Sequence, residues 1–189
     1  MIRRFQRWMR FQQSYRSEPP WDTRNSPPEL IEFVQTHPAG RALDIGCGTG
    51  ANLLTLARAG WEVEGIDYVP RAVRQARATL SEAGLPVKIK VADFLTEQRL
   101  RGKFDLILDM GCYHSLPPND KRIYEAKVSN YMAEHAYYYL FGFLKTQSPR
   151  EGITSDDLAC LKERFQITQE TRGTGVYSRP SVWLLFRRK

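Results

Sequence analysis

The chain has 189 residues, with 28 Lys and Arg against 21 Asp and Glu, and a net charge of +7. This length suits a single domain, 1–189, that buries enough apolar surface to fold without a disulfide or a structural metal. The three cysteines are widely spaced and fit no CxxC or Cys/His pattern, which excludes a secreted disulfide framework and a zinc site, so no metal is expected. No stretch approaches the roughly 18 apolar residues of a membrane span, and arginines interrupt the N-terminus where a signal peptide is apolar. We therefore expect a cytoplasmic protein.

The first sixteen residues, MIRRFQRWMRFQQSYR, predict a basic amphipathic helix. Five arginines are interleaved with an apolar stripe that includes Phe5, Trp8 and Phe11. Two interpretations stay open. The helix packs on its own domain with a solvated outer face, or it binds an RNA, a protein or an anionic surface. With the residues that follow, it forms an N-terminal part, 1–25.

Strand and helix patterns alternate through the rest of the chain. After the N-terminal part, Ser26 is expected to cap the next helix, which has proline in its first turn and ends at about Thr36. The apolar patterns predict strands at 41–45, 61–67, 87–94, 104–109, 137–144, 165–171 and 181–188, and further helices at 51–59, 70–83, 119–136 and 155–165. Such alternation is typical of an α/β fold that is doubly wound around a mostly parallel sheet.

Three glycines follow the first predicted strand in the stretch LDIGCGTG. Open parallel sheets bind ligands beyond the carboxyl ends of their strands, and glycine lets a ligand approach the backbone ahead of a helix. With Ala51 the stretch also satisfies the dinucleotide pattern GxGxxA, and Asp67 lies where its ribose-binding acid belongs. An NAD-dependent oxidoreductase is therefore one alternative.

Carboxylates near three strand ends favour a different ligand. A negative charge at Asp44, ahead of the glycines, suits a cation such as a sulfonium better than an anionic pyrophosphate. Asp67 is placed to accept hydrogen bonds from ribose hydroxyls, and Asp93 from an exocyclic adenine amine.

In order and spacing, LDIGCGTG, GID, VADF and FDLILD resemble the class I S-adenosylmethionine-dependent methyltransferases over about 41–118. Upstream, PPWDTRNSPPELIEFV is similar to a segment of the thiopurine, tellurite-resistance and halide/thiol methyltransferases, although Arg24 and Asn25 replace a glycine-containing stretch. The sequence DMGCYHSLP resembles their loop after the fourth strand. The resemblance implies a three-layer, Rossmann-like methyltransferase fold whose seven-stranded sheet has an antiparallel last strand, and it implies S-adenosylmethionine as cofactor.

The same resemblance implies a set of cofactor-binding residues. Asp44 and the glycine turn would hold the methionine part, Asp67 the ribose, and Asp93 with Phe94 the adenine, while Trp21 would close over the cofactor. Structural roles stay open for some of them, since Asp44 and Asp67 could cap local turns and Trp21 could belong to the core. Cys47 is expected to be a small apolar filler. The full set is Trp21, Asp44, Gly46, Cys47, Gly48, Gly50, Asn52, Asp67, Tyr68, Asp93, Phe94 and Asp109.

The loop 110–119 after the fourth strand supplies the candidate catalytic residues, Tyr113 and His114. We expect Tyr113 to shape the acceptor pocket and His114 to line it or hydrogen-bond there rather than act as a general base. His37 and His135 fall at the opposite edge of the sheet. Because methyl transfer starts from an activated donor, positioning alone can supply about 7 to 11 kcal/mol.

A scarcity of bases favours a soft acceptor on a small molecule, such as a thiol, a chalcogen oxyanion or a halide. No nucleic-acid partner is expected, because DMGCY does not match the Asp/Asn-Pro-Pro-Tyr/Phe loop typical of base methylation. Two alternatives stay open: an RNA or protein methyltransferase that uses the basic N-terminal helix, and a non-catalytic cofactor-binding protein. The sequence does not indicate the oligomeric state.

Overall fold

The computed structural model describes residues 2–85, 87–147 and 150–189. Within these residues, seven strands form one sheet in the order β3-β2-β1-β4-β5-β7-β6. The strands are β1 (Arg41–Ile45), β2 (Glu62–Asp67), β3 (Lys88–Val91), β4 (Phe104–Met110), β5 (Met132–Phe143), β6 (Phe165–Gly175) and β7 (Arg179–Arg188). The helices are α1 (Ile2–Ser14), α2 (Pro28–Thr36), α3 (Ala51–Arg58), α4 (Pro70–Glu82), α5 (Pro118–Tyr131) and α6 (Ser155–Arg164).

The predicted sheet topology is confirmed. β1 pairs in parallel with β2 and with β4, whereas β7 runs antiparallel to both of its neighbours, β5 and β6. The chain builds the sheet outward from β1 to β3 and then returns to the other side of β1 with β4. The strand order therefore reverses beside β1, where open α/β sheets bind their ligands.

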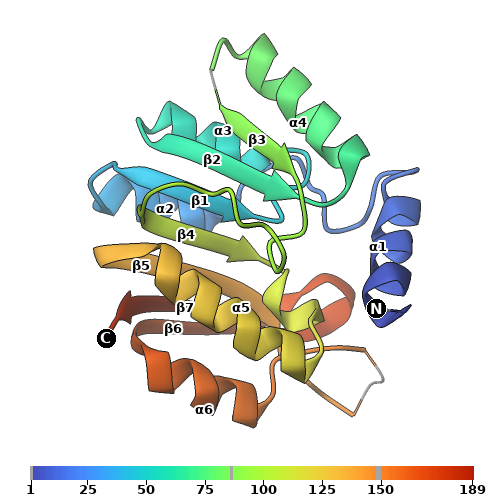
Figure 1. Ribbon diagram of the computed structural model, residues 1–189, viewed down its shortest axis with the longest axis vertical. Coiled ribbons are helices and arrows are strands. Elements are labelled where there is room, and N and C mark those ends of the chain that lie inside the picture. The colour runs from blue at the N-terminus through green and yellow to red at the C-terminus, as the bar shows by residue number, and fades with distance from the viewer. Residues whose placement is uncertain (1, 86, 148–149) are drawn as a thin grey trace.

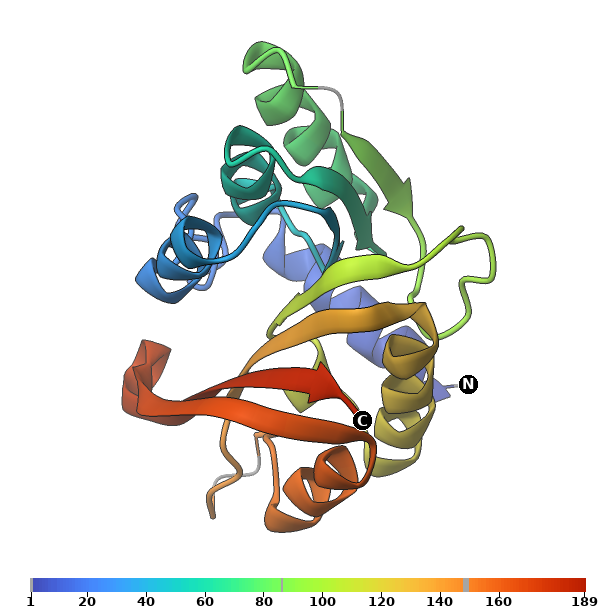
Figure 2. The ribbon, with the colours of Figure 1, turned by 90° about the vertical axis from the view of Figure 1, so that its left-hand side faces the viewer.

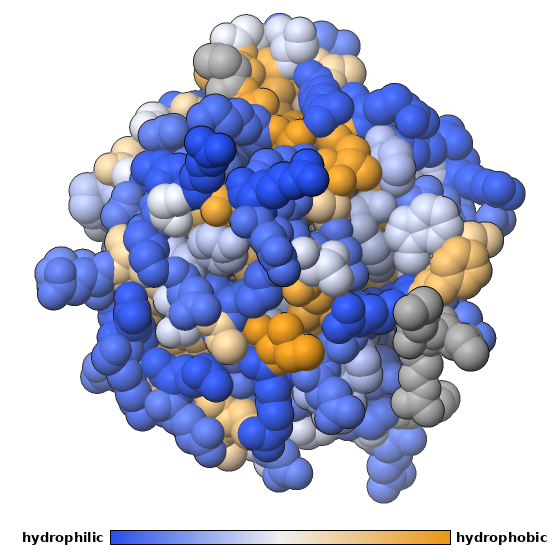
Figure 3. Space-filling view, in the orientation of Figure 1, coloured by the Kyte–Doolittle hydropathy of each residue, from blue (hydrophilic) through white to orange (hydrophobic). Residues whose placement is uncertain are grey.

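Helices cover both faces of the sheet (Figure 2). On one face α2, α3 and α4 bury apolar side chains such as Leu30, Leu53 and Val73 against the strands. On the other face α5 and α6 do the same with Val128 and Leu161. In the orientation of Figure 1 the surface is mostly hydrophilic, with apolar side chains near the top, in the region of α4 and β3, and in a smaller patch near the centre (Figure 3). No helix of the described residues is both long enough and apolar enough to span a membrane.

The N-terminal helix α1 lies across the carboxyl ends of the strands (Figure 1). Arg4 forms an ion pair with Asp120 at the start of α5, with Nη2 and Oδ1 2.8 Å apart. Trp8 donates from Nε1 to the backbone carbonyl of Tyr68, just after β2, over 3.1 Å. These two contacts hold α1 over the edge of the sheet at which a ligand is expected.

Two local predictions are wrong. The helix predicted at 119–136 ends at Tyr131, and the next five residues begin β5 instead. Met132 and Ala136 are fully buried there, so sheet packing overrides the local helical pattern. Ser26 does not cap α2, because Pro27 occupies that position and the Ser26 hydroxyl instead donates to Thr55 of α3 over 2.8 Å.

Candidate cofactor and acceptor site

A cavity of about 790 Å³ lies between the carboxyl ends of the strands and α1. Its floor includes Ile45 at the end of β1, Gly46 just after it, Asp67 at the end of β2 and Met110 at the end of β4. This volume is within the range of roughly 300 to 1,000 Å³ that small-molecule sites occupy. The fold thus creates a ligand-sized space at the point where the strand order reverses.

The glycine turn after β1 has a backbone that only glycine adopts easily, with φ of +73° at Gly46, +54° at Gly48 and +90° at Gly50. Space is short as well, since a Cβ atom on Gly46 would lie 2.2 Å from the sulfur of Cys112, and one on Gly48 would lie 2.9 Å from the hydroxyl of Tyr15. Of the three glycines, Gly46 lines the cavity. The Cys47 side chain packs into the core beneath the turn, on the α2 to α4 side.

Asp67 lines the cavity and also holds its floor together. Oδ2 accepts from the backbone N–H of Gly48 over 3.0 Å, and Oδ1 accepts from that of Val69 over 2.8 Å. Burial raises the pKa of Asp67 to about 6, and the hydrogen bonds from backbone N–H groups oppose that rise. Each oxygen keeps a lone pair for a ligand hydroxyl.

Asp44 is nearly inaccessible, and its Oδ2 atom is buried with no hydrogen-bond partner in the described part of the chain. Burial, together with the nearby charges of Asp109 and Asp67, raises the pKa of Asp44 to about 8. The residue directly precedes the lining residues Ile45 and Gly46. A buried carboxyl without a partner, beside two other acids, is an environment that a cationic ligand stabilises.

Six of the expected cofactor residues do not line the cavity: Asp44, Cys47, Gly48, Gly50, Asn52 and Asp109. Of these, Asp109 and Asn52 support its wall. Asp109 accepts from the backbone N–H groups of Cys112 and Tyr113 over 2.7 and 3.0 Å, and also from the hydroxyl of Tyr124. Burial raises its pKa to about 6. Asn52 donates to the sulfur of Met110 over 3.3 Å, and its Oδ1 atom lies 3.0 Å from the Ser26 hydroxyl. Both residues fix the loops from which the lining residues project.

The far end of the cavity, near β3, is lined by Tyr68, Asp93 and Phe94. Asp93 accepts from the backbone N–H of Leu95 over 2.9 Å, which orders the loop after the strand. The Phe94 ring is buried and meets the ring of Tyr124 edge-on, with centroids 5.0 Å apart. A carboxylate beside an aromatic ring can bind a planar, amine-bearing group.

The segment 19–25, which begins with PPWD, and helix α1 together form the opposite wall of the cavity. Trp21 lines the cavity and meets the rings of Phe11 and Tyr15 edge-on at 5.8 and 6.4 Å. Thr49 of the glycine turn donates to Asp22 over 2.8 Å, which ties this segment to the turn. The sequence interpretation missed Phe11 and Tyr15 as lining residues, although their spacing of four residues puts them on one side of a helix.

The two candidate catalytic residues of the loop after β4 lie in different environments. His114 lines the cavity, its Nδ1 atom is buried without a partner among the described residues, and its ring lies 5.1 Å from that of Phe143. Tyr113 is fully buried and donates to Glu125 of α5 over 2.6 Å. The prediction that Tyr113 shapes the acceptor pocket is therefore corrected, because this side chain belongs to the core and is not part of the lining.

The electrostatic surroundings of His114 are positive. Burial lowers its pKa to about 3, and the charges of Arg179, Lys121 and Arg10 add to this shift. The imidazole is consequently neutral near pH 7. Among the described residues, no group of three or more His, Cys, Asp and Glu side chains is arranged to hold a metal ion.

Comparison with known proteins agrees with this arrangement. The family model of the methyltransferase domain matches residues 42–133, which span β1 to the start of β5. An uncharacterized methyltransferase of Schizosaccharomyces pombe is 32% identical over 121 residues, which cover 64% of this chain and 82% of that protein. The chain belongs to the methyltransferase family. The N-methyltransferase NodS of Bradyrhizobium japonicum, solved in complex with S-adenosyl-L-homocysteine, has the same fold as this chain, with a TM-score of 0.81 and 17% identity.

Other relatives have named activities. The 2-heptyl-1-hydroxyquinolin-4(1H)-one methyltransferase of Mycobacteroides abscessus is 32% identical over 149 residues, which cover 74% of this chain and 66% of that protein. Mouse EEF1A lysine methyltransferase 2 is 29% identical over 155 residues, 79% of this chain and 63% of that protein. The methyltransferase thus spans somewhat less than two thirds of the length of both.

A solved structure from work on the conversion of a disulfide bond into a thioacetal group during echinomycin biosynthesis has a TM-score of 0.80 and 25% identity to the methyltransferase. It covers 95% of this chain and 91% of that one. The likeness therefore includes the N-terminal and C-terminal segments that the family model leaves out.

Proposed function

We propose that this methyltransferase transfers the methyl group to a soft nucleophile on a small molecule, most directly a thiol. The observation that carries the proposal is the placement of His114 within the cavity that α1 covers, beside cations and without an acidic partner among the described residues. A selenium or tellurium oxyanion or a halide would satisfy the same chemistry.

When bound, S-adenosylmethionine supplies a methyl group on a positively charged sulfur. The acceptor sulfur forms a bond to the methyl carbon as the bond to the sulfonium breaks, and a neutral thioether is left. A free thiol has a pKa of about 8.5. Because the pKa of His114 is about 3, moving the thiol proton to His114 is strongly unfavourable. An acceptor that reaches the site already ionised needs no such transfer, and nearby cations stabilise its charge.

The other named residues bind and orient rather than move protons. Asp67 would hold the ribose, Asp93 and Phe94 the adenine, and Asp44 a positive charge of the donor. Trp21, Phe11 and Tyr15 would exclude water from the cavity. Positioning of this kind is sufficient for an in-line displacement from an activated donor.

Two of the similar proteins support a small-molecule acceptor, and one of the two supports sulfur chemistry. The solved structure with 25% identity comes from work on a thioacetal, which is a sulfur compound, and the Mycobacteroides relative is named for a small heteroaromatic substrate. The PPWD and DMGCYHSLP stretches resemble the thiopurine, tellurite-resistance and halide/thiol methyltransferases.

The test is to incubate the protein with labelled S-adenosylmethionine and a panel of thiols, selenite, tellurite, halides, phenols and amines, and to identify the products by mass. We expect methylated thiols or chalcogens to form fastest. Preferential methylation of phenols or amines contradicts the proposal. Cofactor binding without turnover across the whole panel would instead indicate a non-catalytic binding protein.

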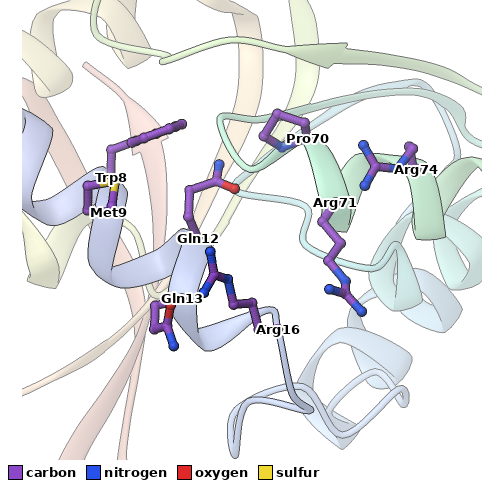
Figure 4. Close-up of a pocket in the computed structure, with 8 residues that line it drawn as sticks. All are labelled: Trp8, Met9, Gln12, Gln13, Arg16, Pro70, Arg71 and Arg74. Atoms are coloured by element: carbon purple, nitrogen blue, oxygen red, sulfur yellow. The ribbon is translucent and has the colours of Figure 1, made fainter.

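A second hollow, of about 300 Å³, favours a different acceptor, RNA. It lies between α1 and the start of α4, and its side chains come from these two helices and from Arg16, just after α1 (Figure 4). Arg16, Arg71 and Arg74 line it, and its described lining includes no acid. If RNA is the substrate, binding should weaken steeply with salt, and replacing Arg71 and Arg74 by Gln should reduce that salt dependence. Salt-independent, weak RNA binding would remove this alternative.

A further inference from the structure

Arg179, at the start of β7, lines the end of the cavity near His114 and Phe143, which we call the acceptor end. Two contacts hold its guanidinium in place. Its guanidinium carbon lies 4.3 Å from the centre of the Phe143 ring. Its Nη2 atom donates to the backbone carbonyl of Glu151 over 2.6 Å. The ring and the hydrogen bond fix the plane and the edge of the guanidinium, so little entropy is lost when a ligand binds to it.

Some N–H donors of the Arg179 guanidinium remain available to a ligand. An arginine carries five N–H donors, and in the described part of the chain no carboxylate forms an ion pair with Arg179. Glu151 lines the same end of the cavity, but its contact with Arg179 is through the backbone carbonyl. Burial and the neighbouring charge of Arg150 both lower the pKa of Arg179, which means that the surroundings do not neutralise it.

This charge faces the space in which the acceptor must lie. Phe143 links Arg179 to His114, because the centre of its ring lies 4.3 Å from the guanidinium carbon and 5.1 Å from the centre of the imidazole. Arg10 of α1 lines the cavity as well, and its positive charge also reaches His114. Arg7 lines the cavity too, but it lies 3.8 Å from Asp120 and is partly neutralised.

We propose that Arg179, stacked on Phe143, is a specificity-determining residue that binds a carboxylate of the methyl acceptor, so that the preferred acceptors are small thiols that also carry a carboxylate. The planar guanidinium matches a carboxylate through two parallel hydrogen bonds. This inference rests on the proposed function, because it takes a small thiol as the acceptor. It adds the chemical class of that thiol and the residue that selects it.

The test compares three small thiols that differ in charge: mercaptoacetate, mercaptoethanol and mercaptoethylamine. We would measure kcat/KM for each with the native protein, with Arg179→Met and with Arg179→Lys. Arg58→Met, an exposed site at the end of α3, is the control for loss of one positive charge. The readout is the ratio between two thiols, compared across proteins, because this ratio cancels the intrinsic reactivity of each thiol.

We expect Arg179→Met to reduce the preference for mercaptoacetate over mercaptoethanol by about 10- to 100-fold, mainly through KM, the range expected for charge-assisted hydrogen bonds. Arg179→Lys should restore part of the preference, since it keeps the charge without the planar fork. Arg58→Met should leave the ratio unchanged. Equal losses for the charged and neutral thiols would overturn the inference while leaving the proposed function in place.

A binding measurement does not depend on turnover. The methylated products, methylthioacetate and methylthioethanol, would be titrated against the complex with S-adenosylhomocysteine, for the native protein and for Arg179→Met, with thermal melting to confirm that both are folded. Selective loss of methylthioacetate binding supports the inference, and equal binding of both products by both proteins overturns it. A native protein that methylates no thiol contradicts the proposed function, whereas the binding result still decides whether Arg179 recognises a carboxylate.

Discussion

Asp67 accepts a hydrogen bond from the backbone N–H of Gly48 over 3.0 Å, which joins the end of β2 to the glycine turn after β1. The second oxygen of the same carboxylate accepts from Val69 at the start of the loop to α4. One buried side chain therefore fixes two of the loops around the cavity while it also lines the cavity.

We predict that Asp67→Ala raises the dissociation constant of S-adenosylmethionine by about a hundredfold or more. Two ribose hydroxyls would lose a charged acceptor, and each such hydrogen bond contributes roughly 1.5 to 3 kcal/mol. The melting temperature should also fall, because two buried N–H groups lose their partner, but the protein should remain folded. Calorimetric titration and thermal melting check this, and unchanged affinity in a folded variant would exclude Asp67 from the cofactor site.

For Asp44→Asn, stability and cofactor binding should change in opposite directions. The pKa of Asp44 is about 8 in the folded protein, against roughly 4 when unfolded. Between these values the unfolded chain has released a proton that the folded chain retains, so the free energy of unfolding falls as the pH rises through this window. Without ligand, Asp44→Asn should therefore melt at a higher temperature than the native protein at pH 8, and the difference should shrink toward pH 4.

Cofactor affinity gives the second half of this test. A negative Asp44 attracts the cationic donor, so the native protein should gain affinity relative to Asp44→Asn as the pH rises toward 8 and above. Titration of the ligand itself affects both proteins equally and cancels in the comparison. A constant ratio of affinities between pH 6 and 9 would show that Asp44 is not near the cation.

Removal of the residues before Ser26 should impair cofactor binding and turnover more than it impairs the stability of the unliganded protein. Phe11, Tyr15 and Trp21 line the cavity from this segment, and aromatic contacts contribute about 0.5 to 1.5 kcal/mol each. An increase of about tenfold or more in the KM for S-adenosylmethionine is the expected result. Trp8→Phe, which loses the hydrogen bond to Tyr68, should show a smaller change in the same direction. Normal turnover with a loss of RNA binding would instead identify α1 as a partner-binding helix.

His114→Ala should reduce turnover of a thiol by no more than about tenfold, which is below the usual contribution of a general base. Because the pKa of His114 is about 3, the imidazole stays neutral from pH 6 to 10 and should cause no break in the pH profile. Native and variant rates should rise together as the thiol ionises. A far larger defect that high pH rescues would show that His114 removes a proton from the acceptor, and it would favour a phenol or amine.

Local patterns in the sequence were sufficient for much of the fold. The strands that become β1 and β4 are short apolar runs, and the turn at Gly46, Gly48 and Gly50 is specified by residues that tolerate positive φ. Parallel strands bring their carboxyl ends to one edge, so Asp67 and Asp93 could be assigned to one site without any knowledge of contacts.

The boundary between α5 and β5 required the tertiary structure. YMAEHA is compatible with a helix as a local pattern, and only pairing with β4 and complete burial of Met132 and Ala136 make it a strand. The same limit applies to the loop after β4. Tyr113 and His114 are neighbours in sequence, yet the 3₁₀ turn at 113–115 buries one in the core and leaves the other on the cavity wall.

By itself, the sequence determined most of the strands, the glycine turn and the acidic strand ends, because each depends on residues that are close together in the chain. Only the tertiary structure decided which residues meet at the acceptor end of the cavity. Phe143 ends β5 and Arg179 begins β7, 36 positions later, and the antiparallel pairing of these strands brings the guanidinium over the ring. No local motif predicts such a contact, because it is created by the register between two strands that are distant in the chain.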